Sequence, residues 1–394
     1  MKIRISWRCS FLLFCAVVVN SMCVAQNAPK PSQPSTPQPA QTEPAVPAQK
    51  APYGEDWTDL NVYDSSLRLK RPLLAETDDD PHTSFIRERY QVEWRPGEPF
   101  DLYVIRPRGV AKPPVILYLY SFPEDTEQFK NNVWCDTAVN GGYAAVGFVG
   151  AVTGHRMRYH LMKDWFVSNM PEALGATVHD VQLILDYLST RNDMDSSRVG
   201  MFASGSGGSI AIMASAVDAR LQVIDLLAPW GDWPTWLAET KVISPAERPE
   251  FTTSAFAAAV APLEPITWLP KMKAKVVRMQ NVRGNKAMPD SAQEKMEAAA
   301  PDFVTINQFG NGQALLSSQR ADEFFQWIKD EMKANPQTQV AFQKDAHLHV
   351  YPAIQVPVPN WPNVGTLDTH KPQEDAQAKQ ASEKDSAKPA SNPK

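Results

Sequence analysis

Apolar runs of strand length alternate with segments of helical periodicity through the middle of the chain. The segment RERYQVEWRPGEPFDLYVIRP predicts two strands around an Arg-Pro-Gly-Glu-Pro turn, and this hairpin would supply antiparallel strands at one end of a sheet. The continuous runs PPVILYLY and YAAVGFVGA are typical of strands that helices cover on both faces. Apolar side chains recur at helical spacing in residues 171–190, and strands and helices keep alternating from SSRVGMFAS to ADEFFQWIKDEM. The pattern predicts an α/β fold with a mainly parallel central sheet flanked by helices and an antiparallel N-terminal hairpin.

The first 25 residues have a different pattern. Basic residues precede an apolar stretch at residues 11–19, and small residues stand just before Gln26. This order is typical of a secretory signal peptide, so we expect export to the periplasm or the extracellular space after cleavage near Ala25. The apolar stretch falls well short of the ~20 residues that span a bilayer, and no stable membrane span is expected.

Two further segments lack the large apolar residues that a folded core needs. Residues 26–52 are rich in Pro, Gln and Ala, whereas residues 351–394 are first Pro-rich and then charged. Because neither segment can bury enough surface to offset its ordering entropy, we predict a disordered linker and a disordered tail. Residues 53–350 between them are long enough for one large α/β domain.

Composition and motifs argue against several classes of function. The formal net charge is −5 and no block rich in Lys and Arg occurs, so nucleic acid is not an expected partner. Cys135 would be the only cysteine after signal cleavage, which excludes an internal disulfide. The pair His347 and His349 lacks further ligands nearby, so no metal site is predicted. A dinucleotide fingerprint would need a glycine in place of Ile210, and a P-loop would need Gly-Lys-Ser/Thr, so no cofactor is expected.

Residues 180–212 carry a specific resemblance. The run DVQLILDYLSTRNDMDSSRVGMFASGSGGSIAI resembles the segment that leads into the nucleophile elbow of α/β-hydrolases, particularly the dienelactone-hydrolase and prolyl-oligopeptidase-like branch. A strand, a tight glycine-rich turn and a helix are the parts of such an elbow. The resemblance covers about residues 87–332 and implies the α/β-hydrolase fold.

The elbow admits two frames, because both place small residues two before and two after the nucleophile. The frame 203–207 puts Gly205 at the nucleophile position. Glycine tolerates the positive φ that this position usually adopts, but it has no atom that can attack. The frame 204–208 puts Ser206 at the apex and requires a strand that is one residue longer.

The resemblance places the catalytic acid and the histidine after later strands, in the chain order nucleophile, acid, histidine. Asn285 stands in the acid's place and Gln313 in that of the histidine. A glutamine amide neither accepts nor releases a proton near neutral pH, so it cannot act as a general base. The replacements at Gly205, Asn285 and Gln313 together indicate a degenerate triad.

Other residues at the same edge of the predicted sheet could still bind a ligand. The Ser206 N–H at a helix start and the Ser121-Phe122 loop are similar to the donors of an oxyanion hole, which bind a carbonyl or an anion. His155 and Arg156 follow a neighbouring strand and could line the pocket, although a solvated basic loop is an equal alternative.

A tryptophan-rich segment follows the next strand. Trp230, Trp233 and Trp236 could form an aromatic wall for a ligand or partner, and core packing is an equal alternative. Asp232 could replace Asn285 as the acid, but it would still need a base.

Two classes of function follow from these residues. The first is an exported pseudoenzyme, a binding or accessory protein for a small carbonyl or anionic ligand. The alternative is an active serine ester or peptide hydrolase that uses Ser206 with an unconventional base, for which His155 is a candidate. A Ser206 hydroxyl within hydrogen-bond reach of a histidine ring would favour the enzyme. No protein partner can be named from the sequence.

Overall fold

The computed structural model describes residues 53–122, 124, 126–151, 166–318, 325–333 and 348–354, all within one compact unit that ends at Ile354. The strands are β1 (Leu73–Asp78), β2 (Phe85–Val92), β3 (Phe100–Pro107), β4 (Pro114–Leu119), β5 (Ala144–Phe148), β6 (Asp195–Ser204), β7 (Leu221–Leu227), β8 (Val276–Val282), β9 (Val304–Phe309) and β10 (Leu348–Tyr351). The helices are α1 (Glu127–Lys130), α2 (Asn132–Val139), α4 (Met170–Ser189), α5 (Ser206–Val217), α6 (Trp233–Glu239), α7 (Arg248–Phe251), α8 (Ser254–Val260), α9 (Pro265–Trp268), α10 (Asp290–Ala299), α11 (Gly312–Ser318) and α12 (Gln326–Lys333). Short 3-10 helices are η2 (Val62–Asp64), η3 (Phe166–Asn169), η4 (Ala261–Leu263) and η5 (Leu269–Lys271).

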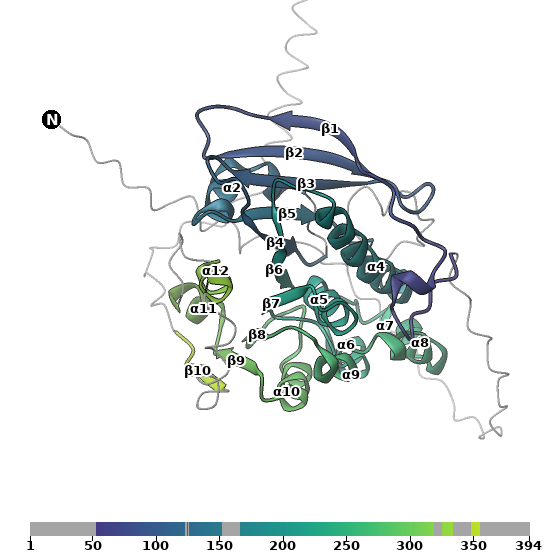
Figure 1. Cartoon of the computed structure of the whole chain (residues 1–394). Coiled ribbons are helices and arrows are strands. Elements are labelled where there is room, and N and C mark those ends of the chain that lie inside the picture. Colours follow the sequence, from purple (N-terminus) through teal and green to yellow (C-terminus); the bar gives the residue numbers. More distant parts are fainter. Residues whose placement is uncertain are drawn as a thin grey trace, which may run out of the picture. The chain divides into compact units, whose positions relative to one another are not determined.

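The described strands form one ten-stranded sheet in the order β1-β2-β3-β5-β4-β6-β7-β8-β9-β10 (Figure 1). The neighbours β1–β2, β2–β3 and β3–β5 are antiparallel, and every pair from β5–β4 to β9–β10 is parallel. Strands β2 and β3 form the hairpin that the sequence predicted. The expected mainly parallel sheet with an antiparallel N-terminal part is therefore confirmed.

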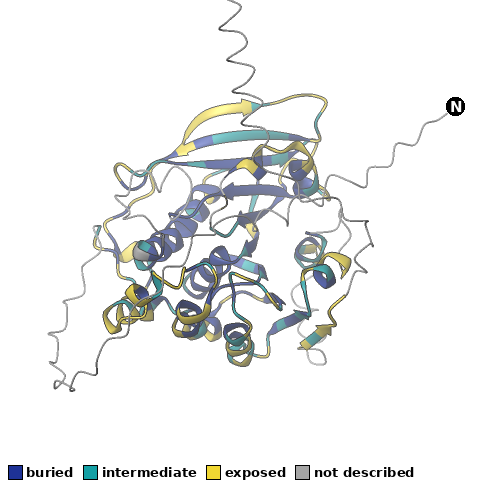
Figure 2. Ribbon diagram, turned by 180° about the vertical axis from the view of Figure 1, so that it is seen from behind, coloured by how far each residue is buried: buried dark blue, intermediate teal, exposed yellow. Residues whose placement is uncertain are grey.

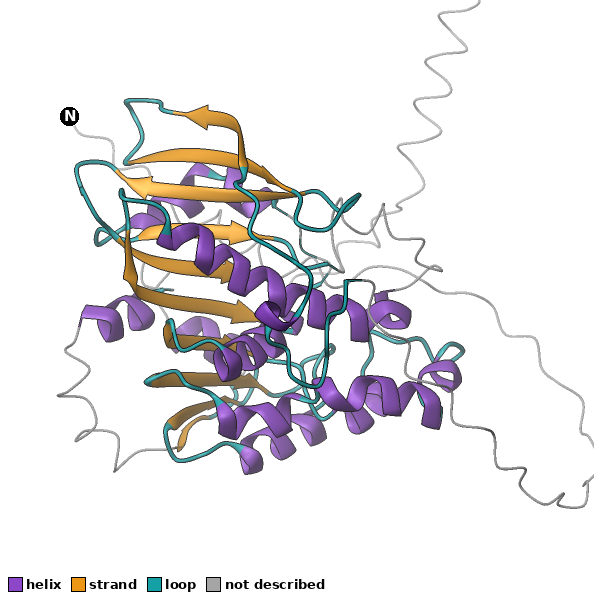
Figure 3. Ribbon diagram, turned by 45° about the vertical axis from the view of Figure 1, so that its right-hand side comes forward, coloured by secondary structure: helices purple, strands orange, loops and turns teal. Residues whose placement is uncertain are grey.

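Helices cover both faces of the sheet (Figure 3). All residues of β4 are buried, and they alternate between the two faces. Val115, Leu117 and Leu119 face the core that includes α4 and α5, whereas Ile116 and Tyr118 face the core that includes α2 and α12. A strand buried on both faces reads as a continuous apolar run, and this explains why sequence pattern alone located it.

The two edge strands are less buried than the centre (Figure 2). The sequence pattern did not indicate β1, whose residues are mostly exposed and lack clear alternation. Strand β10 runs one residue past the predicted domain boundary at 350, because the ring of Tyr351 stacks on that of Phe309 with centroids 4.6 Å apart. No helix within the described ranges is long and apolar enough to cross a membrane. The predicted signal peptide and linker lie outside the described residues, as does the tail after Ile354.

Candidate functional site

The predicted elbow is a sharp turn between a strand and a helix. Strand β6 ends at Ser204, α5 begins at Ser206, and Gly205 between them has φ +51° and ψ −119°. The Gly205 carbonyl accepts hydrogen bonds from the N–H groups of Gly208 and Trp230, both at 3.0 Å. A residue with a side chain would be strained at this φ, so glycine suits the turn.

The space next to Gly205 is already filled. A Cβ atom at Gly205 would lie 2.2 Å from Ser121 Oγ, 2.6 Å from Ser121 Cβ and 3.1 Å from Trp230 Nε1. The first two distances are far below van der Waals contact. The side chain of Ser121, on the loop after β4, therefore occupies the place into which a side chain at position 205 would extend.

Hydrogen bonds tie this loop to the elbow. The Ser121 N–H donates to Ser204 Oγ at 3.2 Å, the Ser206 N–H donates to Ser121 Oγ at 3.3 Å, and the Phe122 N–H donates to Ser206 Oγ at 3.0 Å. The N–H groups of Ser206 and Phe122 are the donors expected for a carbonyl or anionic ligand. In the structure they donate to hydroxyl groups of the protein itself.

The loops that carry the other predicted triad positions leave the same edge of the sheet. Parallel register pairs Ser204 with Leu227, Leu227 with Gln280, and Gln280 with Asn307, so β6 to β9 end side by side. Asn285 follows β8, and Gln313 lies in α11 after β9. Their assignment to the acid and histidine positions stays a prediction.

The side chains at these two positions bond within their own turns. Asn285 Oδ1 accepts hydrogen bonds from the N–H groups of Ala287 at 2.8 Å and Met288 at 3.3 Å. Gln313 Nε2 donates to Ser317 Oγ at 3.3 Å, one helical turn further on. Asn285 consequently stabilises the loop after β8.

The tryptophans after β7 belong to the core. Trp230, Trp233 and Trp236 are all buried, and the Trp230 and Trp236 rings lie 4.8 Å apart. The Trp233 indole donates to Leu263 O, and that of Trp236 donates to Ala287 O, both within 2.8 Å. This favours the packing interpretation over an aromatic wall, although Trp230 also borders Gly205.

Asp232 is held by several neighbours. It has φ +53°, and its carboxylate pairs with Lys295 Nζ at 2.8 Å. The N–H groups of Asp232 and Trp233 donate to the Glu264 carboxylate at 2.8 and 2.7 Å. The pKa of Glu264 is raised, because desolvation by burial outweighs the opposite effect of these backbone donors. The Asp232 carboxylate is thus part of an ion pair with a lysine in the middle of α10.

Glu124 lies on the same loop as Ser121 and was not singled out from the sequence. Its N–H donates to Ser121 O at 2.8 Å. Desolvation raises the pKa of its carboxyl to about 7, although the residue as a whole is exposed. Such a shift depends on the surroundings that the fold provides, so the sequence carries no signal for it.

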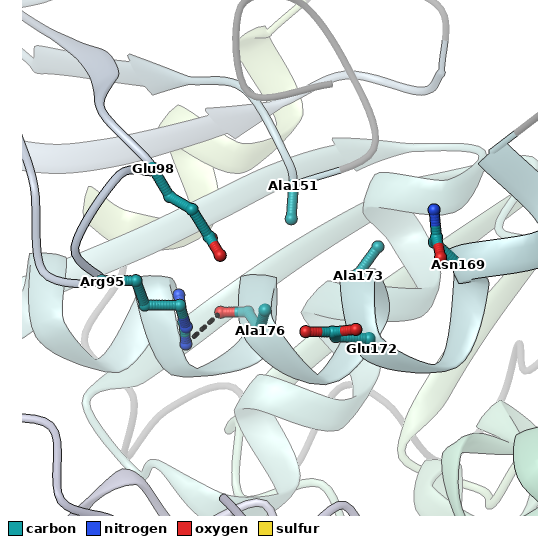
Figure 4. A pocket seen from close by; sticks show the side chains of 7 residues that line it. All are labelled: Arg95, Glu98, Ala151, Asn169, Glu172, Ala173 and Ala176. Atoms are coloured by element: carbon teal, nitrogen blue, oxygen red, sulfur yellow. Dashed lines mark hydrogen bonds between the residues drawn. The ribbon is translucent and has the colours of Figure 1, made fainter. Parts of the chain in front are cut away.

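His155 and Arg156 lie outside the described residues, which stop at Ala151 and resume at Phe166. Close to Ala151 is a small pocket, also lined by Arg95, Glu98, Asn169, Glu172, Ala173 and Ala176 (Figure 4). The Arg95 guanidinium donates to Asp180 Oδ1 at 2.9 Å and is also paired with Glu55. These buried ion pairs fix α4 against the loop after β2.

His179 has a structural role in the core. It is fully buried on α4, and its Nδ1 lies 2.7 Å from Glu55 Oε1. Among the described residues, no group of three or more His, Cys, Asp or Glu side chains is arranged to hold a metal ion.

Comparison with solved structures identifies the fold. Acetyl xylan esterase from Paenibacillus sp. R4 is similar with a TM-score of 0.53 and 15% identity, over 70% of this chain and 92% of that one. Acetyl xylan esterase 1 from Thermoanaerobacterium sp. JW/SL YS485 is similar with a TM-score of 0.51 and 13% identity, over 71% and 92% of the two chains. No protein-family model matches the sequence, and no curated protein does either. The chain has the α/β-hydrolase fold, and the family to which it belongs stays a prediction.

Proposed function

We propose that this chain is an exported α/β-hydrolase-fold protein that has no Ser-His-Asp chemistry and serves as a binding or accessory protein. This proposal rests on the residues found at the elbow. Gly205 occupies the turn and offers no attacking atom, and the Ser121 side chain fills the adjoining space. Acyl transfer by a covalent route requires a nucleophile at that place.

The acid and base positions support the same conclusion. Asn285 and Gln313 carry amides, which can neither take a proton from an alcohol nor stabilise an imidazolium by charge. Asn285 Oδ1 is also committed to the N–H groups of its own turn. A single replaced residue could be compensated by a neighbour, but the loss of all three roles removes the proton path together with the nucleophile.

A ligand at this edge would be a small molecule with a carbonyl or anionic group, since the N–H groups of Ser206 and Phe122 converge there. In the described conformation it would have to displace the hydroxyls of Ser121 and Ser206 from these donors. We therefore expect weak binding at the elbow itself.

The alternative, an active hydrolase that uses Ser206, has a specific difficulty. Ser206 is 4% exposed and lies in the first turn of α5, where its Oγ accepts a hydrogen bond from Phe122 N–H. A nucleophilic hydroxyl has to donate its proton to a base and reach a substrate carbonyl.

A fluorophosphonate probe distinguishes the two functions. We expect the purified mature protein to show no labelling above a heat-denatured sample, because a serine hydroxyl without an activating base stays protonated and weakly nucleophilic. The variants Ser206→Ala and Ser121→Ala serve as controls that locate any signal. Stoichiometric labelling that Ser206→Ala abolishes would establish the enzyme and refute the proposal.

A further inference from the structure

We propose that the Ser121 side chain is a built-in plug of the elbow, matched to Gly205, which keeps a nucleophile side chain out of the nucleophile position. This inference rests on the proposed function, since it takes Gly205 to be the nucleophile position. It adds that the space at this position is filled by Ser121, besides lacking an attacking atom.

The steric part of the argument depends on which Ser121 atoms are involved. Rotation about χ1 would move Oγ away from a new side chain at position 205, but it would leave Cβ in place. Ser121 Cβ lies 2.6 Å from the point where a Gly205 Cβ would be, which is already too close for two carbon atoms. A side chain at position 205 thus requires the Ser121 backbone to move.

The Ser121 backbone is held in place by its own hydrogen bonds. Its N–H donates to Ser204 Oγ at 3.2 Å, and its carbonyl accepts from Glu124 N–H at 2.8 Å. The next residue, Phe122, donates its N–H to Ser206 Oγ at 3.0 Å. Moving the loop away from the elbow would break bonds on both sides of Ser121, so the plug is an integral part of the fold.

One consequence concerns restoration of catalysis. Gly205→Ser by itself would place the new Cβ and hydroxyl in the volume that Ser121 occupies. Restoring a nucleophile therefore requires Ser121→Gly in addition to changes at the acid and base positions.

A double-mutant cycle on thermal unfolding of the mature protein tests the plug without relying on activity. The matched control is Gly97→Ala, because Gly97 has φ +81° with no atom within 4 Å of an added Cβ. It isolates the cost of a positive φ, for which we expect a fall in Tm of about 2 to 4 °C. Gly205→Ala adds the clash with Ser121, and we expect its fall in Tm to be roughly two- to threefold larger.

The same Gly205→Ala substitution is then measured in two variants of Ser121. In Ser121→Gly, which removes Cβ and Oγ, the effect of Gly205→Ala should shrink toward that of Gly97→Ala. In Ser121→Ala, which keeps Cβ, most of the effect should remain. If Gly205→Ala is insoluble, recovery of folded protein by Ser121→Gly is the same supporting result.

An equal effect of Gly205→Ala in the wild-type and Ser121→Gly backgrounds would overturn the plug, as would continued insolubility when Ser121→Gly alone folds. That outcome would leave the labelling experiment untouched. Conversely, labelled Ser206 would refute the proposed function even if the cycle showed strong coupling.

Discussion

Lys329 illustrates how far burial changes a single side chain. It lies on α12 with 3% of its surface exposed, and its Nζ donates to Thr137 O at 2.7 Å. Desolvation, assisted by the charge of Lys333, lowers its pKa to about 8. A buried ammonium with one backbone acceptor is costly, because a carbonyl replaces only part of its hydration.

This shift predicts a pH dependence of stability. Between pH ~8 and the ordinary pKa of 10.5, Lys329 is neutral in the folded state but charged in the unfolded state. The unfolded state then binds more protons, so the free energy of unfolding should rise with pH over this range, by up to about 3 kcal/mol. Below pH ~8 the residue is charged in both states and the full cost applies. Urea unfolding measured at several pH values in this range checks the slope.

Lys329→Met should flatten this part of the profile. The control is Lys130→Met, because the Lys130 side chain is 48% exposed in its pair with Glu127 and should leave the slope as it is. An unchanged slope in Lys329→Met would show that the ammonium is not desolvated in the folded protein.

At the scale of elements, residues 53–67 form an N-terminal strap across α4. Gln182 Nε2 donates to Leu60 O at 2.8 Å, and Tyr63 OH donates to Asp186 Oδ1 at 2.7 Å. Glu55 is part of this strap, and its buried carboxylate contacts both Arg95 and His179. The strap thus joins the sheet edge near β2 to the helix that precedes the elbow strand.

Glu55→Gln should strongly weaken the attachment of the strap to α4 and to Arg95. It removes one of the carboxylates that stabilise the buried Arg95, so we expect a loss of about 3 kcal/mol in the free energy of unfolding, measured with urea. Glu76→Gln is the control, because the Glu76 side chain is 63% exposed in its pair with Arg89 and should cost less than about 1 kcal/mol. Equal effects of the two substitutions would contradict a buried joint.

The same substitution has a defined pH signature. Burial alone would raise the pKa of Glu55, but hydrogen bonds from His179 and Arg95 outweigh it, and the pKa lies below its ordinary value of 4.5. The folded state therefore binds fewer protons than the unfolded state, and this stabilisation is present above pH ~4.5 and lost as the pH falls through the folded pKa. The difference between wild type and Glu55→Gln should accordingly shrink in acid.

At the scale of the whole molecule, export is the property that the first 25 residues predict. Protein isolated from its native host should begin near Gln26, as N-terminal sequencing would determine. Leu12→Arg places a charge in the apolar stretch and should leave the leader uncleaved. An intact Met1 on wild-type cytoplasmic material would contradict export.

The architecture could be predicted from the sequence because its cause is local. A strand covered on both faces must be apolar throughout, as in β4, and a helix with one buried face repeats its buried residues every three to four positions, as Ala292 and Met296 do in α10. Strand β1 was not predicted, because the side chains of an exposed edge strand need not be apolar or alternate.

The sequence likewise predicted only part of the candidate site. The sequence by itself determined which side chains are present, so Gly205, Asn285 and Gln313 could be proposed as the triad positions. It left two frames open at the elbow, because a one-residue change of strand length lies within the error of a sequence pattern; strand β6 ends at Ser204 and leaves Gly205 at the turn.

Only the tertiary structure decided what fills the site. Ser121 and Ser206 are 85 residues apart in sequence, and their contact exists because β4 and β6 are neighbours in the sheet. The burial of Trp230 and its neighbours likewise follows from packing against later segments of the chain. Side-chain identity is a local property, whereas the occupation of space depends on which distant segments the sheet brings together.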